Sequence, residues 1–295
     1  GVDTVFIMEG RLPQRPLSPL WEEMERMGCT LSRPTGNMVR CTGKLRPGTY
    51  RIDGSVSSQY ITGLLFALSM MGAESRLEIT GTMESKPYIT MTESVIRRFG
   101  ADPEHPDAKP FRSPGMIRVE GDWSNGAFFL TANRLGNNLD LRGLDPESVQ
   151  GDRAVLDMLS ELDSGTPVIS AADNPDLVPI LAVAAANLHG AVFTQIHRLR
   201  MKESDRVLSV LQMLQGLGGD AKADDNTLTV SARHLTGGVV DSFNDHRIAM
   251  SAAIASTVCR NTVTILGAQC VQKSYPGFWE VFRSAGGVYE QYLRQ

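Results

Sequence analysis

The sequence lacks the cysteine patterns that bind zinc or build a disulfide framework. Its 295 residues include four cysteines, which form two distant pairs without a C-x-x-C motif or a histidine at zinc-finger spacing: Cys29, Cys41, Cys259 and Cys270. We therefore expect reduced thiols and no metal site. Reduced thiols in turn favour a cytoplasmic location.

The sequence also lacks a long hydrophobic run and an excess of positive charge. Its most apolar run, from Val178 to Ala186, is far shorter than the roughly 20 residues of a membrane-spanning helix, and no targeting segment is visible. A net charge of −4 provides no general positive field for nucleic acid or an anionic membrane. An anionic ligand would have to be held by local basic clusters.

What the sequence does contain is a recurrence of two kinds of helix. The first kind is amphipathic and has a basic residue at or just before its first turn; predicted helices of this kind start near Arg15, Lys86, Arg153, Lys202 and Lys273. The second kind has a polar head and is almost wholly apolar afterwards, which predicts burial; its heads are Ser58, Ser124, Asp176 and Asp245. Hydrophobic residues make up 42% of the chain, enough for one large core or two ordinary ones.

Short β-rich segments separate these helices. They are residues 5–8, 49–56, 76–83, 116–121, 191–199, 226–232 and 261–268. The order strand, buried helix, strand, amphipathic helix, strand, strand predicts a repeated α/β (α+β) unit in which sheets wrap buried helices. One shorter interval between repeats places a domain boundary near Gly121, which gives domains of residues 1–121 and 122–295.

The most informative helix head is the segment LRMKESDRVL, where Lys202, Glu203, Asp205 and Arg206 alternate in sign just before an amphipathic helix. A helix start favours the two acidic residues and disfavours the two cations. Capping alone would therefore not select both cations. A site that needs positive charge for phosphate or carboxylate and an acid for proton transfer would select them together.

Other helix heads allow both a capping and a functional interpretation. In SFNDHRIAM, Asn244 would cap the helix and His246 would be hydrogen-bonded locally, but Arg247 heads a buried helix and favours an anion site. Asp176 follows Pro175, a residue suited to the first helical position, and either complements the helix dipole or takes part in chemistry.

Eight segments, in order along nearly the whole chain, resemble the 5-enolpyruvylshikimate-3-phosphate synthases. These are 3-phosphoshikimate 1-carboxyvinyltransferases of the shikimate pathway, which makes aromatic amino acids, and glyphosate inhibits them. The segments are LPQRPL, GSVSSQY, SKPYI, VEGDWSNGAFFL, NPDLVPILAVAAA, RMKESDR, FNDHRIAM and QKSYPGFW. The resemblance implies two lobes, each of three βαβαββ copies, that close on the substrates, with residues 1–121 binding shikimate phosphate and residues 122–295 binding phosphoenolpyruvate.

The resemblance also implies a reaction and a set of site residues. The 5-hydroxyl of shikimate 3-phosphate adds to C2 of phosphoenolpyruvate, and the tetrahedral ketal then expels phosphate. Residues implied to bind phosphoenolpyruvate are Arg15, Arg206, Arg247 and Lys273. Residues implied to bind shikimate 3-phosphate are Ser57, Ser58, Gln59, Ser85, Tyr88 and Lys202. Asp176 is implied as the base for the 5-hydroxyl, and Glu203, with Lys202 and Lys273, handles the proton at the methylene carbon. The resemblance implies that no organic cofactor is needed.

Two signatures of the family have no counterpart in the sequence. These are a Lys-Ser stretch followed by Arg, and an Asn-Ala-Gly-Thr loop, both near the family's N-terminus. We therefore expect an N-terminally truncated synthase with an incomplete N-terminal lobe and little or no activity alone, which self-associates through the apolar surface that truncation exposes. Arg198 also stands where some members carry Asn, and we assign it no substrate.

Three alternatives remain beside this interpretation. The first is the related enolpyruvyl transferase that acts on UDP-N-acetylglucosamine, whose loop cysteine would fall outside this sequence. The second is a non-catalytic fragment that self-associates. The third, an RNA cyclase of related architecture, is disfavoured by the acidic pI and the lack of a basic stripe.

Overall fold

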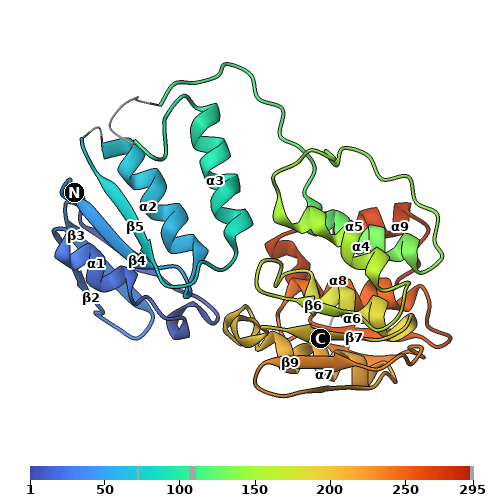
Figure 1. Cartoon of the computed structure of the whole chain (residues 1–295). Coiled ribbons are helices and arrows are strands. Elements are labelled where there is room, and N and C mark those ends of the chain that lie inside the picture. Colours follow the sequence, from blue (N-terminus) through green and yellow to red (C-terminus); the bar gives the residue numbers. More distant parts are fainter. Residues whose placement is uncertain (72, 106–110, 293–295) are drawn as a thin grey trace. The chain divides into compact units, whose positions relative to one another are not determined.

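The computed structural model describes residues 1–71, 73–105 and 111–292, which divide into two compact units (Figure 1). The N-terminal unit comprises Gly1–Val119 with Val149–Gly151, and the C-terminal unit comprises Glu120–Ser148 with Asp152–Gln295. Each unit has its own hydrophobic core. The assignment of one substrate to each of them stays a prediction.

The N-terminal unit begins with a three-stranded antiparallel sheet in the order β1-β3-β2. Its elements are β1 (Thr4–Ile7), the short 3-10 helix η1 (Leu12–Gln14), α1 (Leu20–Arg26), β2 (Cys29–Ser32) and β3 (Met38–Gly43). Helix α1 packs on β2. Strand β1 lies at one edge of the sheet, and its residues Val5, Phe6 and Ile7 are at least half exposed.

The second part of this unit is a strand-helix-strand-helix segment that contains most of its core. The elements are β4 (Thr49–Asp53), α2 (Ser58–Met71), β5 (Arg76–Thr80) and α3 (Lys86–Arg98). Strands β4 and β5 pair in parallel with Thr49 opposite Arg76, and α2 packs on α3. Since both helices follow parallel strands, their N-termini lie at the same edge of the strand pair.

The prediction that α2 is buried on every side is wrong. Phe66 is 36% exposed and Met70 is 75% exposed, whereas Ile61, Leu64 and Leu68 are buried. The main neighbours of α2 are α3 and β5, which cover one face of the helix. Two packing partners therefore leave apolar side chains of α2 on the surface.

The C-terminal unit contains a complete copy of the predicted βαβαββ repeat. The elements of this copy are β6 (Val168–Ser170), α6 (Val178–Asn187), β7 (Ala191–Thr194), the 3-10 helix η3 (His197–Met201), α7 (Arg206–Gly216), β8 (Ala221–Ala223) and β9 (Thr227–Val230). Its sheet has the order β6-β7-β9-β8, in which β6 and β7 are parallel and the other pairs antiparallel. The sequence pattern is confirmed here.

Further elements complete this unit around two buried helices. They are α4 (Trp123–Arg134), the 3-10 helix η2 (Gly151–Ala154), α5 (Val155–Glu161), β10 (Gly238–Asp241), α8 (His246–Ser256), β11 (Val263–Leu266), the 3-10 helix η4 (Ala268–Lys273) and α9 (Phe278–Ser284). Strands β10 and β11 are parallel. Helices α6 and α8 pack on each other in the middle, between α4 and α5 on one side and the strands on the other (Figure 1).

Helices α6 and α8 can be buried because most of their side chains are apolar and many are small. Every residue of α6 is buried, and five of them are alanine or proline between larger aliphatic side chains. Each fully buried Val, Leu or Ile side chain stabilises the fold by about 1.5–3 kcal/mol relative to exposure. The alanines allow neighbouring helices to approach closely, so the predicted burial of these two helices is confirmed.

Several predicted element boundaries differ from the structure. Residues 116–121 form no strand, and the predicted strand over residues 191–199 ends at Thr194. The cause in the second case is Gln195, whose φ of 56° turns the chain out of the extended region and into η3. Helix α6 begins at Val178 rather than at Pro175, so Asp176 lies in a turn before the helix.

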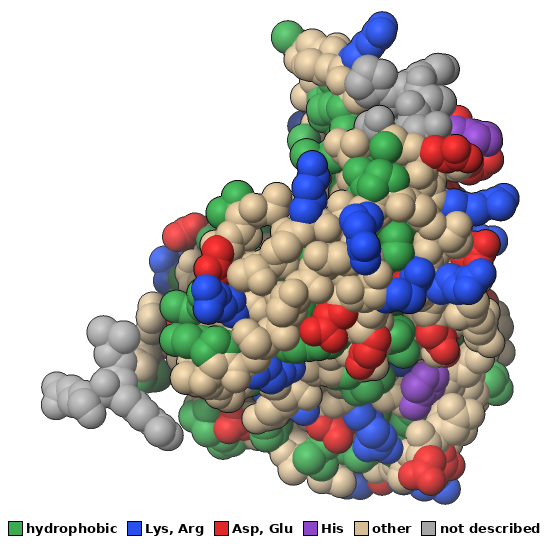
Figure 2. Space-filling view, turned by 90° about the vertical axis from the view of Figure 1, so that its left-hand side faces the viewer, with side chains coloured by type: hydrophobic (Ala, Val, Ile, Leu, Met, Phe, Trp, Pro, Cys, Tyr) green, Lys and Arg blue, Asp and Glu red, His purple; other side chains and the backbone are tan. Residues whose placement is uncertain are grey.

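Three properties of the chain bear on where it resides and on what it could bind: its helix lengths, the distribution of its surface charge, and the state of its cysteines. Within the described ranges, no helix combines the length and apolar character that a membrane span requires. Figure 2 shows basic and acidic side chains interspersed with apolar ones over the visible face. The four cysteines are free thiols.

Candidate active site

Asp176 is the centre of a cluster of charged side chains in the C-terminal unit. Its Oδ1 accepts from Arg206 Nη1 at 2.6 Å and lies 3.4 Å from Lys202 Nζ. Its Oδ2 accepts from Arg247 Nη2 at 3.0 Å, and its backbone carbonyl accepts from Arg247 Nη1 at 3.4 Å. Four of the residues singled out in the sequence therefore meet, although they come from three separate segments.

Arg206 lies beneath Asp176 and binds three carboxylates. Its side chain has 0% exposure, and besides Asp176 it donates to Glu203 Oε2 at 2.6 Å and to Asp245 Oδ2 at 3.0 Å. Arg206 is the first residue of α7, whose N-cap Asp205 accepts from Leu208 N. A ligand would reach this guanidinium only after one of its carboxylates moved.

Asp245 is a site residue that the sequence interpretation missed. It has 0% exposure, caps α8 by accepting from Arg247 N at 3.0 Å, and accepts from Ser204 Oγ at 3.0 Å. The predicted cap, Asn244, is wrong: its φ is 57°, in the left-handed region, and it precedes the capping residue. A usable signal was present, because Asp is a preferred N-cap and directly precedes the apolar run of α8.

Burial and charge act in opposite directions on the groups of this cluster. Burial would raise the pKa of Asp176, but the cations Arg247, Lys202 and Arg206 outweigh burial and hold this pKa well below its usual range. Burial lowers the pKa of Lys202, against the attraction of Asp176. The pKa of Asp245 is lowered because the charge of Arg206 outweighs its burial. The carboxylates are therefore held ionised although they are largely removed from water.

His246 and Lys273 flank this cluster near the start of α8. The Nδ1 atom of His246 is buried without a hydrogen-bond partner, so the expected local hydrogen bond is absent at that atom. Burial, followed by the charge of Arg247, lowers the pKa of His246. Lys273 is exposed and its Nζ donates to Asn244 O at 2.6 Å. Lys273 ends η4 and does not head α9, which begins at Phe278.

The candidate residues of the N-terminal unit gather at the N-termini of α2 and α3. Ser57 directly precedes α2, and its Oγ accepts from Gln59 N at 3.3 Å; Ser58, the first residue of the helix, is buried. Ser85 is buried, adopts φ 54° and directly precedes α3, where Tyr88 N donates to Ser85 O at 3.1 Å. Two backbone hydrogen bonds connect the loop before α2 with the end of β5 and the loop before α3. Gly54 N donates to Thr80 O, and Glu84 N donates to Gly54 O.

The sixth candidate of this unit, Arg15, follows η1 and is half-buried. Its neighbour in space is Tyr60 of α2, whose phenol donates to Pro16 O. Arg15 therefore lies near the same helix as Ser57 and Gln59, within the N-terminal unit.

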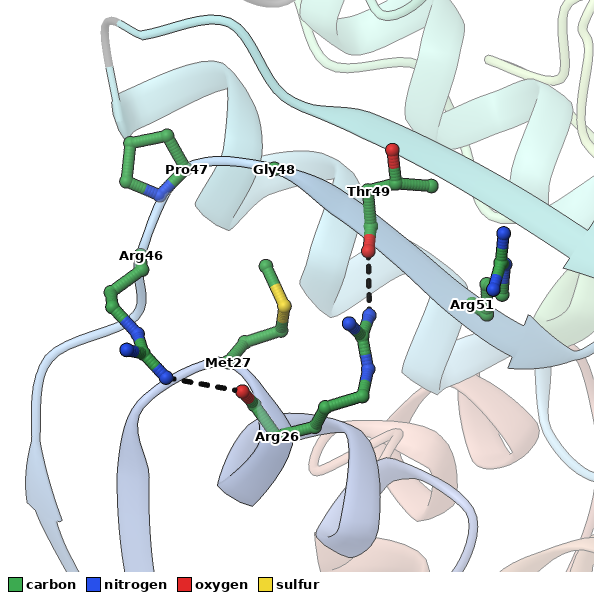
Figure 3. Close-up of a pocket in the computed structure, with 7 residues that line it drawn as sticks. All are labelled: Arg26, Met27, Arg46, Pro47, Gly48, Thr49 and Arg51. Atoms are coloured by element: carbon green, nitrogen blue, oxygen red, sulfur yellow. Dashed lines mark hydrogen bonds between the residues drawn. The ribbon is translucent and has the colours of Figure 1, made fainter.

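A separate hollow in the N-terminal unit contains none of the predicted site residues (Figure 3). It has a volume of about 480 Å³ and lies between the end of α1 and the start of β4. Arg26 Nη2 donates to Thr49 O at 2.6 Å, and Arg46 Nη2 donates to Arg26 O at 3.3 Å. Glu23 and Glu78 pair with Arg26 and Arg51, so most of this positive charge is already balanced.

The described part of the chain contains no group of three or more His, Cys, Asp or Glu side chains arranged to hold a metal ion. The donors that the active-site cluster offers are guanidinium and ammonium groups. These are suited to phosphate and carboxylate ligands.

Comparison with known proteins connects this cluster to one family. A family model described as EPSP synthase (3-phosphoshikimate 1-carboxyvinyltransferase) matches residues 4–282. The chain is 36% identical to the 3-phosphoshikimate 1-carboxyvinyltransferase of Clostridium novyi, over 98% of this chain and 73% of that protein. It is also 36% identical to the enzyme of that name from Clostridium kluyveri, over 99% of this chain and 75% of the relative.

A solved structure shares the fold. The EPSP synthase of Acinetobacter baumannii superposes with a TM-score of 0.72 at 22% identity, over 97% of this chain and 74% of that one. The family match, the relatives and the shared fold agree, and the chain belongs to the EPSP synthase family.

Proposed function

We propose that this chain transfers the enolpyruvyl group of phosphoenolpyruvate to the 5-hydroxyl of shikimate 3-phosphate, with release of phosphate. The observation that carries the proposal is the cluster around Asp176, which concentrates three cations and three carboxylates in a member of the EPSP synthase family. Two substrates with phosphate and carboxylate groups repel each other unless cations separate them. Lys202, Arg206 and Arg247 supply that charge.

In the proposed reaction the hydroxyl oxygen forms a bond to C2 of phosphoenolpyruvate while C3 gains a proton. The ketal then loses phosphate from C2 and a proton from C3, which restores the double bond. One group must take the hydroxyl proton and another must give and take the proton at C3. Positioned acid–base groups of this kind contribute roughly 10²–10⁴-fold each.

Asp176 is proposed as the base for the hydroxyl proton. In the ligand-free protein it is a weak base, because three cations hold its pKa down. Substrate phosphate and carboxylate groups would share those cations, and this sharing would raise the pKa of Asp176 toward its ordinary range. Substrate binding itself would therefore activate the base.

Glu203 is proposed to transfer the proton at C3, assisted by Lys202 and Lys273. Glu203 is partly exposed, with 33% of its side chain accessible, so it can reach both Arg206 and a ligand. If Glu203 left Arg206 for the substrate, the guanidinium would become available to a ligand carboxylate. Arg206 and Arg247, with Arg15 and Lys273, are the groups proposed to bind phosphoenolpyruvate.

The N-terminal unit is proposed to bind the shikimate moiety and its phosphate. The supporting observation is that Ser57, Ser58, Gln59, Ser85 and Tyr88 lie at two helix N-termini on one edge of the β4–β5 pair. Backbone N–H groups at helix N-termini attract anions. Hydroxyl and amide side chains there add neutral donors that can wrap a phosphate.

The related transferase that acts on UDP-N-acetylglucosamine is not favoured, because the matching family and the curated relatives carry the shikimate name. A cytoplasmic location is proposed because the four cysteines are free thiols.

Self-association is proposed through the exposed apolar residues of the edge strand β1, Val5, Phe6 and Ile7. Analytical ultracentrifugation tests it, and a single monomeric species at every concentration would contradict it.

The test of function combines binding with turnover. Calorimetry measures whether shikimate 3-phosphate binds and whether phosphoenolpyruvate then binds in its presence, while mass spectrometry follows the enol ether product. The low turnover expected from the sequence stays a prediction, and the binding measurement does not depend on it. Binding of UDP-N-acetylglucosamine in place of shikimate 3-phosphate would contradict the proposal.

A matched pair of variants tests the role of Asp176. Asp176→Asn removes the base and should lower turnover roughly 10²–10⁴-fold while substrate binding persists. Asp157→Asn changes an exposed carboxylate on α5 of the same unit and should leave turnover unchanged. Equal turnover of the two variants would exclude Asp176 as the base.

A further inference from the structure

A second buried carboxylate, Asp152 of η2, lies behind the Asp176 cluster and has no role in the proposed reaction. Asp152 is 4% exposed. Its Oδ2 accepts from Ser124 Oγ, and its Oδ1 accepts from Asn174 Nδ2 at 3.2 Å. Both hydrogen-bond donors are neutral, and the cation Arg247 acts on Asp152 through its charge without a hydrogen bond to it.

The first donor fixes Asp152 to a rigid element. Ser124 is in the first turn of α4, and its backbone N donates to the N-cap residue Asp122 at 3.0 Å. Trp123, between them, is 3% exposed, and its Nε1 donates to Asp145 O at 3.1 Å. The start of α4 is therefore well anchored, and it holds Asp152 in place.

The second donor belongs to the turn that carries Asp176. Leu177 N donates to Asn174 O at 3.1 Å, which closes a four-residue turn with Pro175 and Asp176 at its two central positions. Asn174 is 6% exposed and is the first residue of that turn. The bond from Asn174 to Asp152 therefore links α4 and η2 to the turn that presents the Asp176 carboxylate.

We propose that Asp152 is a positioning residue that pins Asn174 and thereby holds the Asp176 turn against the three cations. This inference deepens the proposed function, since Asp176 would touch substrate and Asp152 would act only through Asp176. The geometry that carries it is the continuous path from Ser124 through Asp152 and Asn174 to the turn.

The charge of Asp152 and its positioning of the turn have opposite effects on the pKa of Asp176. This difference distinguishes a positioning role from a purely electrostatic one. Asp176 is faced by Lys202 from the segment after η3, by Arg206 of α7, by Arg247 of α8 and by the like charge of Asp152. Loss of the Asp152 charge alone would lower the pKa of Asp176, since a repelling neighbour disappears. Loss of the turn position would raise that pKa, since Asp176 would move away from its cations.

Two substitutions at Asp152 divide these contributions. Asp152→Asn removes the charge but can keep both links, because its Oδ1 still accepts from Asn174 and its amide can donate to the Ser124 hydroxyl. Asp152→Ala removes charge and links together. The matched control is Asp157→Ala, an exposed carboxylate five residues along on α5.

The first measurement uses the ligand-free full chain and does not depend on activity. Carboxyl ¹³C NMR follows the titration of Asp176, assigned with Asp176→Asn. In the wild type and Asp152→Asn the Asp176 signal should stay in its ionised position down to the lowest pH at which the fold persists. In Asp152→Ala it should titrate nearer the ordinary aspartate value of about 3.9. Equal behaviour of the Asn and Ala variants would overturn the proposal.

The second measurement connects position to function. Asp152→Ala should lower kcat roughly 10- to 100-fold, as a misplaced reacting group does, with a smaller change in KM, and Asp152→Asn should restore most of the loss. Absence of turnover in the wild-type chain would count against the proposed function alone, because the NMR result would still decide the role of Asp152. Unchanged kcat in a folded Asp152→Ala variant would overturn the positioning role.

Discussion

Replacement of Arg206 by methionine tests whether the buried ion cluster stabilises the C-terminal unit as its geometry indicates. Arg206 is fully buried and binds Asp176, Glu203 and Asp245. Methionine fills a similar volume but leaves the carboxylates without their shared cation. Asp245 is affected most, because its own exposure is 0% and Arg206 is the only cation that forms an ion pair with it in the described part of the chain.

The expected magnitude follows from the cost of breaking a buried pair. Removal of one partner from a buried ion pair destabilises a protein by about 3–5 kcal/mol. Asp176 keeps Arg247 and Lys202, so the lower end applies, about 3 kcal/mol at neutral pH. For a domain of this size such a loss lowers Tm by roughly 6–12 °C. Differential scanning calorimetry on the full chain measures it.

The pH dependence gives the prediction its sharpest test. In the wild type the pKa of Asp245 is lowered from 3.8, so its stabilisation is present above that pH and is lost as pH falls through the folded pKa. Without Arg206, burial would dominate and raise the pKa of Asp245 above its unfolded value. Protonation of Asp245 would then remove the unpaired buried charge. The loss of stability caused by Arg206→Met, relative to the wild type, should therefore become smaller as pH falls from 7 toward 4.

A matched control separates burial from charge pairing as such. Arg134 of α4 pairs with Asp163 on the surface, where the two side chains are 45% and 31% exposed. Exposed pairs contribute about 0–1 kcal/mol, so Arg134→Met should change stability little at any pH. The reasoning would be refuted if Arg206→Met were no more destabilising than Arg134→Met, or if its deficit grew on acidification.

Two further predictions concern local structure of the same unit. Gly216→Ala should destabilise by about 1–3 kcal/mol in chemical denaturation, although alanine favours helices, because an added Cβ would lie 2.4 Å from Val239 O; a stabilised variant would show that α7 and β10 can move apart. Asp245→Ala should lose the α8 cap to Arg247 N and be less stable than Asp245→Asn by about 1 kcal/mol, because asparagine also caps helices. Equal thermal stability of these two variants would contradict a capping role.

The sequence predicted the repeat because periodicity reports directly on burial. The βαβαββ order from β6 to β9, the complete burial of α6 and the burial of α8 up to Ala255 follow from runs of apolar residues whose polar heads mark the helix starts. The same reasoning failed for α2. An apolar run says that a helix can be buried, but the number of neighbouring elements decides whether its second face is covered.

Site residues were predicted in type but not in arrangement. The alternating charges from Lys202 to Arg206 indicated a site because capping could not account for the cations. The pattern could not show that Arg206 would be entirely buried. Nor could it show that Asp176 and Asp245 would both form ion pairs with it. These residues lie 30 and 39 positions from Arg206 in the chain.

What the sequence determined by itself was the α/β repeat, the family and the residue types gathered at helix heads, since these depend on local periodicity and short segments. Only the tertiary structure decided which charges meet. It brought Asp176 to Lys202, Arg206 and Arg247, and placed Asp152 behind the turn that carries Asp176. The physical reason is that ion pairing and burial depend on distances between segments far apart in the chain, which packing of the helices and strands fixes.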